Sequence, residues 1–436
     1  MDDKRGSENN ICVERKTCRI CGSSEFEPVI SLGEQYIASI FVKEDFVAGK
    51  DLTYPLDVVR CSAKDGCGLV QLKHTINPDV MYSNYGYRSG TNEIMLANLR
   101  DIASKGESLV DLSSGDIVLD IGCNDGTLLN SYKTEGLDKV GFDPANNVVE
   151  AAKELGYEII NDYFSFAPFD RVRPGKKAKV VTSIAMFYDL DDPCKFVSDV
   201  KNLLAEDGLW IIEIFYLQFM LDKTTFDTIC HEHLEYYALK QVEWMLDLYD
   251  LRLHDIEFND INGGSFRLFV RHKSFGDVPE DKKVYLDSVR EAESDAKLHT
   301  HEPYERFNKS VNKAKNDLMG LLGQLQEENK KIYVYGASTK GNTLMQFYGI
   351  DNSIIGKAAD RNPDKWGLKT PVTNIPIVSE KEARADKPDY FLVLPWHFLK
   401  GFVIREKDFL DDGGKFIAPL PVVSVIGANG YKKIIE

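Results

Sequence analysis

One glycine-rich turn constrains the fold of this chain more than any other feature: the motif DIGCNDG, residues 120–126, follows the buried run IVLDIG. Glycine lets the backbone turn tightly and approach a ligand closely. A strand, a turn and a helix form the unit of open α/β sheets, whose ligands bind at the carboxyl ends of the strands. The spacing differs from GxGxxG, which disfavours a loop that binds a dinucleotide pyrophosphate.

The segments around this turn alternate between buried strands and amphipathic helices. Strands are predicted for IVLDIG, KVGFD, EIIND, AKVVTSIAMF and LWIIEIFY, and helices for NNVVEAAKELG and for DPCKFVSDVKNLLAEDG, which ends on Gly208. A second series, IYVYGA, GKAAD, DYFLVLP and KFIAPLP, begins near residue 331. This alternation predicts an α/β fold with two parallel, doubly wound sheets.

Composition and cysteine spacing divide the chain further. Five of the eight cysteines precede residue 70, residues 90–110 have helical spacing, and residues 285–330 are charged and predicted helical. We therefore predict a cysteine-rich zinc-binding module over 11–80, a first α/β domain over 81–275, a helical connector over 276–330 and a second Rossmann-like domain over 331–425.

The charge and the apolar content exclude several classes of function. The net charge is −16, which disfavours a nucleic-acid binder because such proteins carry a basic surface. No stretch approaches 18 uncharged apolar residues, and the polar start MDDKRGSENN lacks the apolar core of a signal peptide. We expect a cytoplasmic protein without a membrane span, a monomer or weak dimer, whose thiols are reduced or bind metal.

The N-terminal cysteines have the spacing of a metal site. Four thiolates suit tetrahedral Zn(II), and the predicted ligands are Cys18, Cys21, Cys61 and Cys67. The second pair is C-x5-C, wider than usual, so its insertion must loop out. Cys12 and His74 are reserve ligands, and the alternative is a set of metal-free thiols.

Acidic residues follow the next two strands. Asp143 ends KVGFD, where a carboxylate suits the two hydroxyls of a ribose, and Asp162 follows the third strand, where it can face an adenine. Asn161 is an equal candidate beside Asp162. The alternative is that all of them are ordinary turn residues.

A cluster of histidines follows the strand that contains Glu213. The segment FDTICHEHLEYY, residues 226–237, places His231 and His233 around Glu232, and we expect it above the cofactor edge of the sheet. It is not the zinc-protease motif HExxH. A neutral imidazole can accept a proton near pH 7, which predicts acid–base chemistry. A structural helix start is the alternative.

Two resemblances rest on these motifs. DIGCNDG with Asp143 and Asp162 resembles class I S-adenosylmethionine-dependent methyltransferases, which implies that Asp120, Gly122, Asn124 and Gly126 face the methionine part of that cofactor. The order of the cysteine module, DIGCNDG, FDT-x-x-HEH-x-x-YY, NGGSFR, YGASTKGNTLMQ and DRNPDKWG resembles the sugar C-methyltransferase family over about residues 15–425. The resemblance implies methylation of C3 of a nucleotide-linked 4-keto-deoxysugar, with structural zinc and a C-terminal domain that binds the nucleotide sugar.

The family pattern also implies roles for single residues. His233 would be the base that forms the enolate, and Glu232 would position it, with His231 as the competing base. The chain departs from the family at Cys230, where a Tyr is usual, and at Tyr188, in place of a His after the fourth strand. The phenolic hydroxyl of Tyr188 could replace a donor, whereas the thiol of Cys230 is a poorer one. Cys230 could instead be a nucleophile if a neighbouring histidine stabilised its thiolate. The implied substrate-binding residues are Tyr82, Tyr85, Arg88, Lys340, Asn342, Arg361 and Lys365, with Tyr87 in the same aromatic cluster.

Alternative functions remain open from the sequence. GASTKGNT resembles a P-loop but has Asn342-Thr343 where Lys-Ser/Thr is required, so ATP hydrolysis is disfavoured. A sugar O-methyltransferase would need a base but no ketone. A zinc-stabilised nucleotide-sugar-binding protein without catalysis would need neither, but the intact DIGCNDG and HEH motifs argue against it.

Overall fold

The computed structural model describes residues 11–46, 52–82, 88–91 and 93–433. Contacts divide the chain into two compact units. Unit 1 comprises Met1–Glu27, Arg60–Leu217 and Leu234–His299, and unit 2 comprises Pro28–Val59, Gln218–His233 and Thr300–Glu436. The segment that carries the HEH motif therefore belongs to the unit of the C-terminal sheet. The four-part division made from the sequence cuts the chain differently and stays a prediction.

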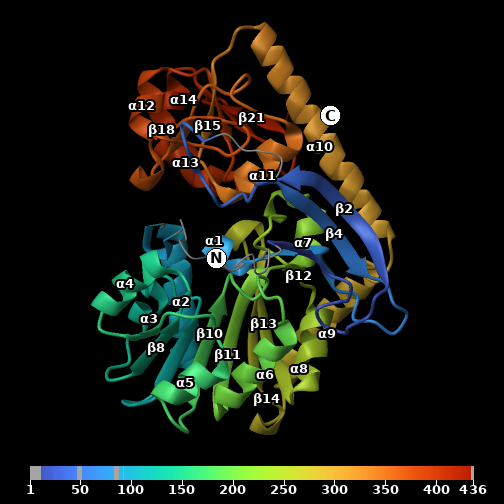
Figure 1. Ribbon diagram of the computed structural model, residues 1–436, viewed down its shortest axis with the longest axis vertical. Coiled ribbons are helices and arrows are strands. Elements are labelled where there is room, and N and C mark those ends of the chain that lie inside the picture. Colours follow the sequence, from blue (N-terminus) through green and yellow to red (C-terminus); the bar gives the residue numbers. More distant parts are fainter. Residues whose placement is uncertain (1–10, 47–51, 83–87, 92, 434–436) are drawn as a thin grey trace, which may run out of the picture. The chain divides into compact units, whose positions relative to one another are not determined.

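Unit 1 is built on a seven-stranded sheet in the order β13-β14-β11-β10-β7-β8-β9 (Figure 1). The strands are β7 (Ile117–Ile121), β8 (Asp138–Phe142), β9 (Glu158–Ile160), β10 (Ala178–Ile184), β11 (Leu204–Phe215), β13 (Leu251–Asn259) and β14 (Ser265–His272). The first five are parallel, and β14 pairs antiparallel with both β11 and β13. The α/β fold and the class I methyltransferase sheet are thus confirmed, but the hairpin β13–β14 was not foreseen.

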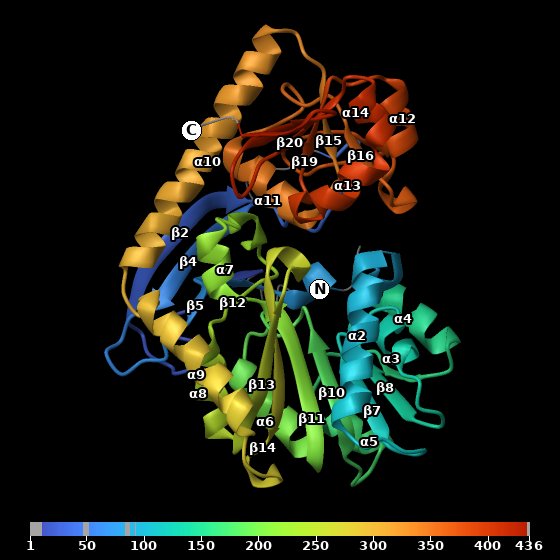
Figure 2. The same ribbon diagram turned by 180° about the vertical axis from the view of Figure 1, so that it is seen from behind.

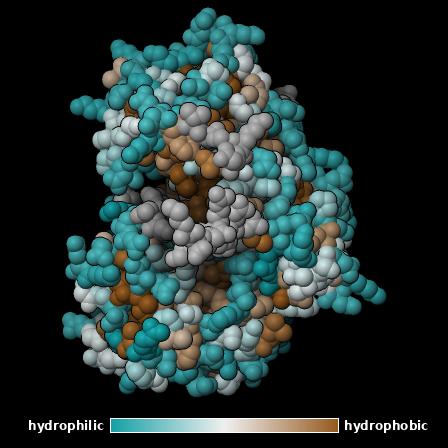
Figure 3. Space-filling model, in the orientation of Figure 1, coloured by the Kyte–Doolittle hydropathy of each residue, from teal (hydrophilic) through white to brown (hydrophobic). Residues whose placement is uncertain are grey.

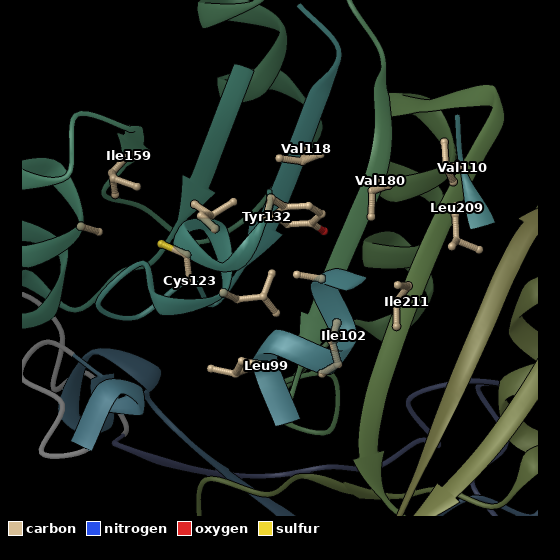
Figure 4. Close-up of a cluster of buried hydrophobic side chains, with 14 of the residues drawn as sticks. Leu99, Ile102, Val110, Val118, Cys123, Tyr132, Ile159, Val180, Leu209 and Ile211 are labelled. Carbon is tan, nitrogen blue, oxygen red and sulfur yellow. The ribbon is translucent and has the colours of Figure 1, made fainter. Parts of the chain in front are cut away.

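Helices cover both faces of this sheet (Figure 2). On one face α2 (Glu93–Leu109), α3 (Thr127–Ser131) and α4 (Asn146–Glu154) share a buried apolar cluster with the strands. Leu99 and Ile102 of α2 lie in this cluster with Val180 and Ile211 (Figure 4). Side chains alternate along a strand, so Trp210 points to the other face. There its ring centroid lies 6.1 Å from that of Phe196 in α6 (Pro193–Leu203).

The end of α6 differs from the prediction. The helix stops at Leu203 and β11 begins at Leu204, so Gly208 does not terminate a helix. Gly208 lies where β10 and β11 shift register, and a Cβ there would lie 2.9 Å from the Ala205 carbonyl oxygen. A close backbone approach inside the sheet therefore explains why residue 208 is glycine. In the sequence alone, such a glycine looks the same as one that ends a helix.

The N-terminal part of unit 1 forms short strand pairs. β1 (Cys12–Glu14) pairs antiparallel with β6 (His74–Ile76), and β5 (Val70–Leu72) pairs antiparallel with β12 (Glu235–Tyr236). The chain just after the HEH motif thus returns to the cysteine module. After β12, α8 (Leu239–Leu248) and α9 (Glu280–Asp295) pack against β13.

Unit 2 is built on a second seven-stranded sheet in the order β18-β16-β15-β19-β20-β21-β22. Its strands are β15 (Ile332–Tyr335), β16 (Ala358–Asp360), β18 (Ile377–Ser379), β19 (Tyr390–Val393), β20 (Lys415–Ala418), β21 (Ser424–Gly427) and β22 (Gly430–Lys433). The first five are parallel to one another; β21 pairs antiparallel with β20, and β22 pairs antiparallel with β21. This confirms the predicted second α/β unit.

Helices and two strands complete unit 2. The helices are α11 (Thr339–Tyr348), α12 (Glu380–Ala385), α13 (Leu399–Arg405) and α14 (Lys407–Asp411). Most of the neighbouring strands β2 (Phe26–Gln35) and β4 (Tyr54–Cys61) belongs to this unit as well. The predicted helical connector is two helices: α9 ends in unit 1, and α10 (Glu302–Glu327) begins in unit 2. Between them Lys297 has φ of 55°, which ends helical geometry.

Among the residues that the structure describes, no helix combines the length and the apolar content that a bilayer crossing needs. Hydrophilic residues cover most of the face shown in Figure 3, and the apolar residues on it are scattered in small groups.

Candidate functional site

The DIGCNDG turn has the backbone that its glycines predict. Gly122, Asn124 and Gly126 have φ of 75°, 51° and 77°, a region that favours glycine and tolerates asparagine. A Cβ on Gly126 would lie 3.0 Å from the Cβ of Ala152 in α4. The turn therefore needs glycine both for its conformation and for the approach of the neighbouring helix.

Two buried carboxylates lie at this turn. Asp143 directly follows β8, and its two oxygens accept hydrogen bonds from the backbone N–H groups of Asn124 and Ala145, each at 2.9 Å. Asp120 accepts a hydrogen bond of 2.6 Å from the Thr182 hydroxyl. Burial, followed by the charges of Asp143 and Asp125, raises the pKa of Asp120 to about 7.

These side chains fit S-adenosylmethionine. Three carboxylates, those of Asp120, Asp125 and Asp143, interact electrostatically at one strand edge. A ligand that carries a sulfonium and an ammonium group relieves this repulsion. Each oxygen of Asp143 keeps a second lone pair beside the backbone contact, which is what a ribose hydroxyl needs.

The next strand brings Asp162 and Asn161 to the same edge. The Asn161 amide donates to the Asp143 carbonyl oxygen at 2.9 Å, so it braces the neighbouring turn. Asp162 is exposed and accepts from the backbone N–H of Tyr163 at 2.8 Å. Asp162 thus remains the candidate for the adenine, and its role stays a prediction.

The segment before α2 contacts the DIGCNDG turn (below, the cofactor turn). Sequence reasoning missed this contact. The backbone N–H of Ser89 donates to Asn124 at 3.0 Å, and that of Gly90 donates to Asp125 at 2.9 Å. Arg88, just before them, is exposed. Tyr82 is half-buried at the end of α1 (Pro78–Tyr82). Tyr85 and Tyr87 lie outside the described residues.

The four predicted zinc ligands form one cluster in unit 1. Their sulfur atoms all lie within 4.8 Å of one another, with 3.4 Å between Cys18 and Cys67 and 3.5 Å between Cys21 and Cys61. Four thiolates at about 2.3 Å from a tetrahedral Zn(II) would be separated by about 3.8 Å. The residues present therefore fit zinc, and the reserve ligands Cys12 and His74 are not part of the cluster.

The two histidines of the HEH motif have different hydrogen-bond partners within unit 2. The Nδ1 atom of His233 lies 2.6 Å from the Thr228 carbonyl oxygen, and the Nε2 atom of His231 lies 3.2 Å from the Tyr54 carbonyl oxygen. A carbonyl oxygen only accepts, so each of these ring nitrogens donates. The lone pair of neutral His233 is therefore on Nε2, and that of His231 is on Nδ1.

The environment of His233 favours its neutral form. Burial lowers the pKa of His233 to about 4; the positive charge of Lys340 also lowers it, while the carboxylate of Glu232 acts in the opposite direction. Glu232 itself is 4% exposed. His233 is thus unprotonated at neutral pH, as a base must be before it accepts a proton.

Unit 2 places further groups around Lys340 that sequence reasoning missed. The Trp396 Nε1–H donates to the buried Asp227 carboxylate at 2.9 Å, and burial raises the pKa of Asp227. The charges of Asp227 and Cys230 act on Lys340, whose pKa is lowered by burial. Burial and then Lys340 lower the pKa of His397 to about 3. Lys340 is thus close to groups of both the FDT-x-x-HEH motif and the segment PWHF, which are far apart in the sequence.

The two residues that depart from the family lie in different units. Tyr188 belongs to unit 1, where its ring stacks on Phe215 with centroids 4.3 Å apart. Cys230 belongs to unit 2, is completely buried, and its carbonyl oxygen accepts from the backbone N–H of His233 at 3.1 Å. These positions leave their predicted catalytic roles untested.

The remaining predicted substrate residues differ in whether their polar groups already have hydrogen-bond partners within the protein and in how exposed they are. Asn342 is buried and its amide donates to the Ala38 carbonyl oxygen at 2.7 Å. The Lys365 ammonium donates to the Ala337 carbonyl oxygen at 2.7 Å. Arg361 is exposed. Of the two cations, Lys365 and Arg361, that of Arg361 is the more accessible.

The NGGSFR motif has a structural explanation in unit 1. Arg267 is 3% exposed, and its guanidinium donates to Glu213 at 2.8 Å and to Asn98 at 3.0 Å. Asn98 also donates to Glu213 at 2.5 Å. This buried network joins α2, β11 and β14.

Models of three protein families match successive parts of the chain. A zinc binding domain matches residues 18–82, a methyltransferase domain matches residues 92–256, and a C-methyltransferase C-terminal domain matches residues 260–421. Their order is that of the cysteine cluster, the cofactor turn and the C-terminal sheet.

One relative is similar over nearly its whole length. The C-methyltransferase NovU of Streptomyces niveus is 30% identical over 414 residues, which cover 94% of this chain and 97% of NovU. An uncharacterised methyltransferase of Schizosaccharomyces pombe is 43% identical over 47 residues, 11% of this chain and 18% of that protein. A solved S-adenosylmethionine-dependent methyltransferase of Clostridium acetobutylicum, with a TM-score of 0.31 and 13% identity over 42% of this chain and 93% of that one, is too distant to carry an argument.

Proposed function

The chain belongs to the C-methyltransferase family, and from that premise we propose that it methylates a carbon atom, C3, of a nucleotide-linked 4-keto-deoxysugar. Its class as an S-adenosylmethionine-dependent methyltransferase with a zinc-binding domain follows from the family and domain matches. The substrate and the position of the new methyl group are our proposal.

A carbon acceptor must first lose a proton, because a C–H bond has no lone pair to attack with. A ketone at C4 acidifies the proton on C3, and the base takes it to leave an enolate. The observation that carries this step is the 2.6 Å contact between His233 Nδ1 and the Thr228 carbonyl oxygen. It directs the lone pair to Nε2, the atom that we assign as the base.

Charged neighbours in unit 2 support the developing enolate. Lys340 acts electrostatically on His233 and supplies a positive charge for an anionic intermediate. The carboxylate of Glu232 stabilises the imidazolium that forms when His233 takes the proton. When bound, S-adenosylmethionine supplies an electrophilic methyl group for the enolate carbon and leaves as S-adenosylhomocysteine.

The substrate-binding cations are part of the proposal. Arg361 and Lys365 of unit 2 would pair with the diphosphate of the nucleotide in an otherwise acidic protein. Arg361 is the clearest test because it is exposed. Arg361→Gln should raise the KM for the nucleotide sugar with little change in the affinity for S-adenosylhomocysteine.

The proposal is tested by incubating the protein with methyl-¹³C-labelled S-adenosylmethionine and a panel of 4-keto nucleotide sugars. NMR correlation of the labelled methyl group then identifies the atom that carries it. A methyl on C3 supports the proposal. A methyl on oxygen would make the chain an O-methyltransferase, and no transfer to any member would make the 4-keto sugar assignment wrong.

A further inference from the structure

Arg19 lies between two zinc ligands of the cluster, Cys18 and Cys21, and its side chain is completely buried. Two of its guanidinium nitrogens donate at 2.7 Å, one to the Leu72 carbonyl oxygen and one to the Thr75 hydroxyl. The four-thiolate site and these two hydrogen bonds together fix where the guanidinium points.

The remaining nitrogen of the guanidinium faces two carboxylates. Its Nε atom lies 3.5 Å from an oxygen of Glu235 and 3.5 Å from an oxygen of Asp191. The Glu235 side chain is 0% exposed, whereas that of Asp191 is 52% exposed. Arg19 and Glu235 thus form a fully buried pair, in which burial raises the pKa of Glu235 and the positive charge of Arg19 opposes that rise.

The two carboxylates belong to the segments that carry the proposed chemistry. Glu235 lies on β12 and follows His233 by two residues in the chain. Asp191 lies in the loop after β10 that contains Tyr188. The Tyr188 carbonyl oxygen accepts from the backbone N–H groups of Leu234 at 2.8 Å and of Glu235 at 3.1 Å. The cysteine module, the Tyr188 loop and β12 therefore meet at Arg19.

We propose that Arg19 and Glu235 are positioning residues. They link the four-cysteine site to the chain segments of Tyr188 and His233 and so fix the positions of those segments. This inference rests on the proposed role of His233 and on the role predicted for Tyr188 from the sequence. Neither Arg19 nor Glu235 touches the substrate; they hold one end of the segment that does. A base displaced by about 1 Å loses on the order of 100-fold in rate, so a loosened β12 should lower kcat more than binding.

The test compares Glu235→Gln with a matched control, Glu243→Gln. Glu243 also pairs with an arginine, Arg290, at 2.6 Å, but on the surface of α8. We expect Glu235→Gln to keep one zinc per chain and wild-type affinity for S-adenosylhomocysteine. Its kcat with a 4-keto nucleotide sugar should fall about 10- to 100-fold with little change in KM. Glu235→Asp, which restores a carboxyl group, should recover part of that loss.

A second readout needs no substrate. The titration of the His233 imidazole, followed by NMR, should move from its lowered pKa towards the ordinary histidine value in Glu235→Gln, because a loosened segment admits water. Glu243→Gln should leave it unchanged. A kcat within twofold of wild type, or an unchanged titration of His233, overturns the inference.

Other outcomes remain decisive. If Glu235→Gln does not fold, Arg19→Lys takes its place, since lysine keeps the charge but lacks the planar fork; a wild-type kcat in Arg19→Lys overturns the inference. If the wild-type protein methylates no carbon of any keto sugar, the proposed function fails, and the His233 titration alone decides the positioning role.

Discussion

The Nδ1 atom of His233 lies 2.6 Å from the carbonyl oxygen of Thr228. This contact assigns the ring proton to Nδ1 and the lone pair to Nε2, the reverse of His231, whose Nε2 faces the Tyr54 carbonyl oxygen at 3.2 Å. The two neighbouring histidines thus carry the lone pair that can accept a proton on different ring nitrogens. Only one of them is expected to act as the base.

Substitution of each histidine should separate their roles. His233→Asn should lower kcat by about 10²- to 10⁴-fold, the usual contribution of a general base, and leave the calorimetric affinity for S-adenosylhomocysteine unchanged. His231→Asn should lower kcat less. If His231→Asn is the slower variant and His233→Asn retains near-normal turnover, the two roles must be exchanged.

The pH dependence should report the environment of His233. Its pKa is lowered to about 4, so the unprotonated base persists as the pH falls, and kcat/KM should decline only below about pH 5 instead of near 6.5. Lys340→Met removes a charge that lowers this pKa, so the acid limb should move to higher pH. An acid limb near 6.5 that Lys340→Met does not move would contradict the assignment.

The same lowered pKa affects stability in the acid range. The unfolded chain binds a proton on each histidine near pH 6.5, whereas buried His233 and His397 take it up only near pH 4 and 3. Stability should therefore fall as the pH decreases from about 6.5 towards those values. Enzymatic rates at low pH should therefore be measured after short exposures of the protein to acid. Recovery of activity on return to pH 7.5 is the control that the protein has not unfolded irreversibly.

Cofactor binding should release protons from Asp120. Its pKa of about 7 leaves it about half protonated at pH 7, and a nearby sulfonium or ammonium group favours the carboxylate. Calorimetry in buffers of different ionisation enthalpy should give a release of about half a proton at pH 7. Asp120→Asn should abolish the release, and its absence in the wild-type protein would exclude a titrating Asp120.

Zinc should be a structural component of unit 1. Protein purified without chelator should hold one zinc per chain, and Cys18→Ser/Cys61→Ser should lose it together with a substantial part of the stability of the module. Cys194→Ser is the matched control, because Cys194 lies outside the cluster. Full zinc content in the double variant would move the site elsewhere.

The strands and the cofactor turn could be predicted because their signals are local. Buried runs such as IVLDIG specify β7, and a turn that requires left-handed backbone at Gly122 and Gly126 specifies the start of α3. Gly208 misled the prediction because a glycine at a register shift in a sheet has the same sequence signal as a helix stop. The hairpin β13–β14 is local in the sequence and was missed, whereas the pairing of β14 with β11 depends on long-range contacts that no local signal gives.

The candidate site could be predicted only in part, for the same reason. The four cysteines and the HEH motif carry their chemistry in their spacing. The partners of HEH do not: Lys340 and His397 are more than a hundred residues away, and only the folding of unit 2 brings them together. Arg19 was overlooked because its role depends on Glu235, which lies more than two hundred residues further along the chain.

The central claim is that His233 forms an enolate, and proton exchange tests it most directly. The wild-type protein, the 4-keto nucleotide sugar that it methylates and S-adenosylhomocysteine are incubated in deuterated water, where methyl transfer cannot occur, and the C3 proton signal is followed by NMR. We predict that wild-type protein exchanges this proton for deuterium and that His233→Asn does so at least 100-fold more slowly. Equal exchange rates in the two proteins would contradict the account.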